Sequence, residues 1–106
     1  MALTRDFKET VAARVQSDSA FARALLGEAI TLFINGEPES AKLILRDLVN
    51  ATVGFEALAE EIHKPAKSLH RMLSQSGNPI MSNISSVFAA IKRALKVEVH
   101  AQMVAV

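Results

Sequence analysis

The feature that most restricts how this chain can fold is Pro65, which stands three residues after the end of a short helical pattern. In residues 55–62 the apolar side chains recur at helical spacing, and a second such pattern fills residues 65–74. Proline fits the first turn of an α-helix and no later position, because it lacks an amide hydrogen and its ring clashes with the preceding turn. The sequence therefore predicts two short helices joined by only two residues, His63 and Lys64.

Helical periodicity also governs most of the remaining chain. Breaks at residues 17–19, 35–36 and 52–54 separate three helices in the first half, and a last helix ends near Leu95. Half of the residues are hydrophobic, while glycine, proline and aromatic residues are few, so the composition favours helix as well. We expect an all-α domain of five to six helices, in which the second helix buries Phe21, Leu25, Ala29, Leu32 and Phe33.

The end of the chain follows a different pattern. After Leu95 apolar and polar residues alternate as far as Met103, which predicts one short β-strand. A chain of 106 residues forms one domain, and we divide it into N-terminal helices (1–53), the region of the two short helices (54–95) and the strand (96–106). Because a lone strand lacks backbone partners, we expect it to pair with the same segment of a second copy and to make a homodimer.

Several classes of function are disfavoured by what the sequence lacks. It has no cysteine, so disulfides and thiolate metal sites are excluded, and its three histidines do not have metal-ligand spacing. No serine stands in a nucleophile motif. No apolar run approaches the length of a membrane span, and the first residues lack a signal-peptide core. We expect a cytoplasmic protein that is not an enzyme and needs no metal or cofactor.

The charge of the chain is distributed unevenly, although its formal net charge is only +1. From Ile62 to Val97 there are six Lys or Arg residues and no Asp or Glu; the remainder has six Lys or Arg, all eleven acids and a net charge of −5. A basic face is often only a solvated surface. An acid-free run of 36 residues, however, favours a polyanionic partner.

Two short helices joined by a tight turn, the second of them basic, follow the plan of a helix-turn-helix. Its inward positions are predicted to be Leu58, Ala59 and Ile62 on the first helix and Leu69, Met72 and Leu73 on the second. The outward side chains then suit DNA: Lys67, His70 and Arg71 for base edges, Ser68 and Ser74 for shorter hydrogen bonds, and Lys64 for phosphate. Asn78 forms a turn that in related folds lies along the DNA backbone, so the candidate DNA-binding residues are Lys64, Lys67, Ser68, His70, Arg71, Ser74 and Asn78.

Residues 55–95 resemble the helix-turn-helix of phage-repressor-like bacterial regulators. More narrowly, FEALAEEI, KPAKSLHRML, SGNP and NISSVFAAIKRAL are similar to the "probable addiction module antidote" proteins, which are HigA-like antitoxins. The opening LTRDFKETVAARVQ and the segment INGEPESAKLILRDLVNATVGFEAL also look like that family, and SLxRxLSxxGNP is its most specific pattern here. The resemblance implies an all-helical DNA-binding regulator of a palindromic operator in the bacterial nucleoid, often encoded beside a small basic RelE-like toxin.

Two residues of the turn depart from that family's pattern. His63 stands where glycine is usual, and it can adopt a left-handed conformation only at some cost. Lys64 stands where an aliphatic residue is usual, so we expect its stem to lie on the core and its amine in solvent. Two alternatives stay open: an interaction module whose acidic N-terminal helices neutralise a toxin, and an orphan regulator without a toxin.

Overall fold

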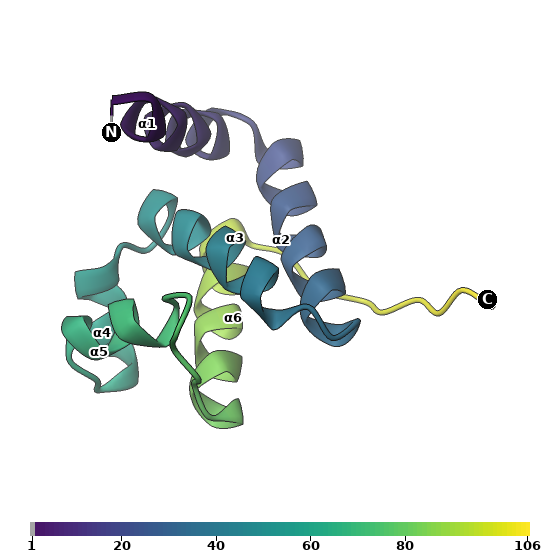
Figure 1. Ribbon diagram of the computed structural model, residues 1–106. Helices are drawn as coiled ribbons and strands as arrows, with labels where there is room; N and C mark the ends of the chain where they lie inside the picture. Colours follow the sequence, from purple (N-terminus) through teal and green to yellow (C-terminus); the bar gives the residue numbers. More distant parts are fainter. Residues whose placement is uncertain (1) are drawn as a thin grey trace.

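A computed structural model describes residues 2–106 of the chain, with the side chains of residues 2–6 and 8 left aside. In that part of the chain six helices account for the regular structure (Figure 1), and their bounds are α1 Ala2–Ser17, α2 Ser19–Ile34, α3 Pro38–Ala51, α4 Phe55–Ile62, α5 Ala66–Met72 and α6 Met81–Leu95. The predicted all-α class is confirmed. The Cα radius of gyration is 13.5 Å, close to the ~13 Å expected for about 100 residues in one compact domain.

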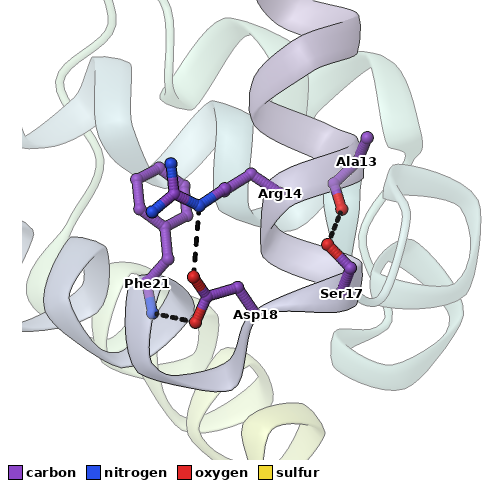
Figure 2. A network of polar contacts seen from close by, with 5 residues as sticks. All are labelled: Ala13, Arg14, Ser17, Asp18 and Phe21. Carbon is purple, nitrogen blue, oxygen red and sulfur yellow. Dashed lines mark hydrogen bonds and ion pairs between the residues drawn. The ribbon is translucent and has the colours of Figure 1, made fainter.

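The corner between α1 and α2 is formed by a single residue, Asp18. Its carboxylate accepts a hydrogen bond of 3.1 Å from the backbone N–H of Phe21 and so caps α2 (Figure 2). The other carboxylate oxygen pairs with Arg14 Nε at 3.1 Å, and the guanidinium lies 4.6 Å from the centre of the Phe21 ring. The hydrogen bond from Phe21, followed by that from Arg14, lowers the pKa of Asp18. The corner is thereby fixed by one carboxylate.

Helix α3 is the centre of the fold and contacts α1, α2, α4 and α6. Helical spacing in the sequence predicts an inward face of Ala41, Ile44, Leu45, Leu48 and Val49. This face is confirmed, since Ile44 is partly buried and the other four residues are fully buried. Pro38 at the start of the helix sets the first turn without losing a hydrogen bond that the helix needs. The core thus forms where α3 meets the other helices.

The predicted inward face of α2 is partly wrong. The helix buries Ala22, Leu26 and Ala29, while Phe33 is 36% exposed and makes an edge-to-face contact with Phe88 of α6. Alanine occupies two of the three buried positions, and α2 packs against α3. Phe33 and Ile34, near the end of α2, are exposed and lie toward α6.

The predicted C-terminal strand is wrong for a single chain: among the described residues no β-strand occurs, and residues 97–106 have no regular secondary structure. Lys96 ends α6 in the left-handed conformation, with φ of 57°. The chain beyond it runs outward as an extended tail (Figure 1). Without a second strand in the fold, the tail has no ladder to join. Within residues 2–106, no helix combines the length and hydrophobicity that crossing a membrane requires.

Candidate nucleic-acid interface

The turn between α4 and α5 is made by His63, Lys64 and Pro65. His63 has φ of 58° and ψ of 46°, so the predicted left-handed conformation is confirmed. Lys64 N–H donates to the carbonyl of Ala59 at 3.0 Å, which closes the end of α4. Pro65 lies just before the first residue of α5, and its carbonyl accepts bonds from Ser68 and Leu69 at 2.9 and 3.2 Å. The link is therefore one residue longer than predicted.

The predicted division of α4 and α5 into an inward and an outward face agrees with the burial. Leu58 and Ala59 of α4 and Leu69 of α5 are buried, as is Leu73 just beyond it, whereas Ile62 and Met72 are partly buried. On the outer side, Lys64, Lys67, His70, Arg71 and Asn78 are exposed, and Ser68 and Ser74 are half-buried. Lys64, whose amine we expected in solvent and whose stem we expected on the core, is exposed as a whole residue.

His70 has a packing partner that the sequence did not indicate. Its ring stacks on the ring of Phe55, with centroids 3.9 Å apart and planes at 18°. Phe55 is the first residue of α4 and is 9% exposed, so the stack joins the start of α4 to the outer side of α5. The imidazole is consequently held in one orientation, and only its outer edge and face remain for other contacts.

The segment between α5 and α6 is packed closely against the end of α5. A Cβ atom at Gly77 would lie 2.0 Å from the carbonyl oxygen of Arg71, so only glycine allows this approach. The Ser74 hydroxyl donates to the same carbonyl at 2.7 Å, and Gly77 N–H donates to the carbonyl of Ser74 at 3.1 Å. Ser74 thus closes the end of α5, while Asn78, beyond it, is exposed.

Lys42 of α3 holds this segment from the inside. Its side chain is buried, and its Nζ donates to the carbonyls of Gln75 at 3.3 Å and of Gly77 at 2.5 Å. The ammonium also pairs with Glu39 at 2.9 Å. A buried ammonium is costly unless its N–H groups have partners, and here three oxygens provide them. Lys42 therefore fixes the Gln75–Gly77 backbone relative to the helical core.

Two cations of the acid-free run, residues 62–97, have carboxylate partners in the folded chain. Lys92 pairs with Glu98 at 3.2 Å, and Arg93 pairs with Glu61 of α4. Both acids lie just outside the run. Among the side chains that the structure describes, no carboxylate pairs with the four other cations, Lys64, Lys67, Arg71 and Lys96. Three of these four cations, Lys64, Lys67 and Arg71, lie on the α4–α5 turn and on α5, whereas Lys96 ends α6.

The sequence analysis did not single out Lys42, although helical spacing places it on the inward side of α3. Position 42 falls three residues before Leu45 and seven before Val49, both on the inward face of α3. A lysine at such a position signals a buried charge that needs oxygen partners. The inward face that we expected of this helix consisted of apolar residues alone and left Lys42 out.

Among the side chains that the structure describes, no group of three His, Asp or Glu residues is placed to hold a metal ion. Comparisons of the chain with protein-family models, with curated proteins and with solved structures find no match. What distinguishes the site is a short, exposed, basic helix whose position is fixed from both ends.

Proposed function

We propose that the protein is a sequence-specific DNA-binding transcriptional regulator and that it is the antitoxin and autorepressor of a toxin–antitoxin pair. The proposal of DNA binding is supported mainly by the residues on the outer side of α5. There Lys67 and Arg71 lie one turn apart, exposed, and without an acid partner among the described side chains. Arginine so placed can make two parallel hydrogen bonds to guanine in the major groove.

The remaining candidate residues support this arrangement in different ways. Lys64 lies at the turn, where an ammonium can contact phosphate without reading sequence. Asn78 follows the segment held by Lys42, so a backbone contact there would be made by a fixed loop. His70, stacked on Phe55, is the residue with the least freedom to adapt to a base. We therefore assign base reading mainly to Lys67 and Arg71.

A regulator of this type binds as a dimer to a palindromic operator. Two recognition helices related by a two-fold axis contact successive major grooves about 34–36 Å apart. We propose that this protein is a homodimer and that its C-terminal segment makes the contact between the copies.

A gel-shift titration with the protein's own promoter fragment tests the DNA-binding proposal. Arg71→Ala is expected to weaken specific binding by about 1–3 kcal/mol, since a bidentate contact to a base would be lost. Arg23→Ala is the matched control, because it removes one exposed arginine from α2. If both variants bind the operator like the parent, α5 is not the recognition helix.

The antitoxin role rests on the resemblance described above and on the acidic N-terminal half, which has ten of the eleven acids before Ile62. Such a surface could cover a toxin whose RNA-binding face is basic. Coexpression with the product of the neighbouring gene, followed by size exclusion at low salt, tests it. Without a complex, the protein is an orphan regulator; a complex without operator binding would favour the interaction module.

A further inference from the structure

An apolar groove of about 380 Å³ lies between α2 and α6. Its walls include Phe33 and Ile34 at the end of α2 and Met81 and Phe88 on α6. Ile34 is 73% exposed and Met81 is 83% exposed. Exposed apolar side chains that gather in one place usually mark a binding surface and not ordinary protein surface.

The C-terminal tail, residues 97–106, is rich in apolar residues, and its last residues, 100–106, are exposed. Val97 packs against the core and Val99 lines one end of the groove, but the chain then runs outward from the helices (Figure 1). Met103 and Val104 are 93% and 85% exposed. One chain thus has both an apolar groove and an exposed C-terminal tail that begins beside this groove.

The tail is badly suited to enter its own groove. The tail leaves the helices (Figure 1) and would need a bend to return along the groove, yet residues 97–106 contain no Gly, Pro, Asn, Asp or Ser, the residues that form tight turns. Four of the ten residues are valine, whose branched side chain favours extended backbone. An extended segment of this composition reaches outward, toward another molecule.

The exposed part of the tail is long enough to span the groove. The seven steps from Val99 to Val106 span about 23 Å in extended form, at ~3.3 Å per residue. The α6 wall from Met81 to Lys92 is about 16 Å long, at ~1.5 Å per residue. A tail from a second copy is therefore long enough to cover the whole wall.

We propose that the groove between α2 and α6 binds the C-terminal tail of a second copy, and that the exchange is reciprocal across a two-fold axis. Each copy would then cover the exposed apolar side chains of the other, which is a common route to a dimer. Lys64, Lys67 and Arg71 do not line the groove, so the dimer leaves the basic side of α5 open. The inference rests on the proposed dimer and not on DNA binding.

Cross-linking tests the contact directly, because the chain has no cysteine of its own. Ile34→Cys and Met103→Cys are made in separate copies, mixed, and treated with a short bifunctional thiol reagent. We expect a covalent dimer that joins positions 34 and 103. The control replaces Ile34→Cys by Leu43→Cys, since Leu43 is 56% exposed on α3 and does not line the groove. Equal yields in the two mixtures would overturn the proposal.

The double variant, with both cysteines in one chain, separates exchange from folding back. Exchange predicts cross-linked species of twice the chain mass or more at dilute protein concentration. If the cross-link instead forms within single chains, the tail occupies its own groove and the proposal is wrong.

Light scattering across a dilution series gives a second measurement. Removal of residues 101–106 and, separately, Ile34→Asp should each raise the dimer dissociation constant at least about 10-fold, because each deletes apolar contact at two symmetric sites. Leu43→Asp should leave it unchanged. A parent that is monomeric throughout, or whose groove is covered only by a protein of another sequence, overturns the inference. Dimers unaffected by both changes would also overturn it, yet an operator gel shift of those dimers would still support the proposed function.

Discussion

Two of the non-helical segments, residues 73–80 and 97–106, are held very differently. In the first, Lys42 binds the carbonyls of Gln75 and Gly77, and Gly77 itself lies against the end of α5. In the second segment, the Lys92–Glu98 pair is the last hydrogen bond or ion pair along the chain among the described residues. Irregular backbone is therefore fixed when its carbonyls find donors inside the fold. A segment without such donors has only its apolar side chains to offer, and these need a surface elsewhere.

Gly77→Ala would break the better-held segment and is expected to have the largest effect. The added methyl group would meet backbone atoms of Arg71 and Met72, which cannot move without disturbing the end of α5. We expect a loss of about 3 kcal/mol of unfolding free energy, measured by urea titration. Gly27→Ala, in α2 with nothing near the new atom, should instead stabilise by roughly 0.5–1 kcal/mol. Similar losses in both variants would contradict the packing described here.

Lys42→Met keeps the length of the side chain but removes the donor. Two carbonyls would lose a charged partner, so we expect a loss of about 2 kcal/mol and faster hydrogen exchange at Gly77 N–H. Glu39→Gln is the control, since that carboxylate is 65% exposed and its removal should cost less than about 1 kcal/mol. Unchanged exchange at Gly77 would mean that the loop is ordered by its packing alone.

His63→Gly tests a third non-helical segment, the turn between α4 and α5, where the backbone itself is strained. Histidine at φ of 58° is disfavoured, and glycine adopts this conformation freely. We expect a gain of about 0.5–1 kcal/mol in urea titration, reduced by the greater freedom of glycine in the unfolded chain. Lys96→Gly, at φ of 57°, is a matched second site and should behave alike. A loss at position 63 but not at 96 would show that the imidazole has a partner of its own.

Removal of residues 101–106 should have the smallest effect on the monomer. At protein concentrations where light scattering gives the mass of one chain, we expect a change below about 0.5 kcal/mol in unfolding free energy, since these side chains are exposed. A larger loss would show that the tail packs on its own chain in solution.

The sequence predicted best where local chemistry decides the structure. The bounds of α4 were obtained from Gly54 and from the turn before Pro65, because these residues restrict the backbone whatever surrounds them. The outward residues of α5 followed from helical spacing in the same way. The left-handed conformation of His63 was expected on different grounds, because the family that the chain resembles usually has glycine at this position.

Prediction failed where contacts distant in sequence decide. In α2 most residues are apolar, so spacing alone could not choose the buried face, and packing against the other helices decides it. The alternation after Leu95 is real, but a strand needs a partner strand, which the chain itself does not provide. The contact of His70 with Phe55 and the reach of Lys42 to the Gly77 loop join residues 15 and 35 positions apart. No local pattern encodes these two contacts.

The stack of His70 on Phe55 has a spectroscopic consequence. A proton held over an aromatic face is shielded by the ring current, so the imidazole carbon-bound protons of His70 should resonate upfield of those of His63 and His100. The chain has no tyrosine or tryptophan, so only its five phenylalanines share the aromatic region of the spectrum. A one-dimensional proton spectrum could therefore follow a single side chain on the outer side of α5. Loss of the shielding would report separation of α4 from α5, and a shift with shielding retained would report a ligand at that surface.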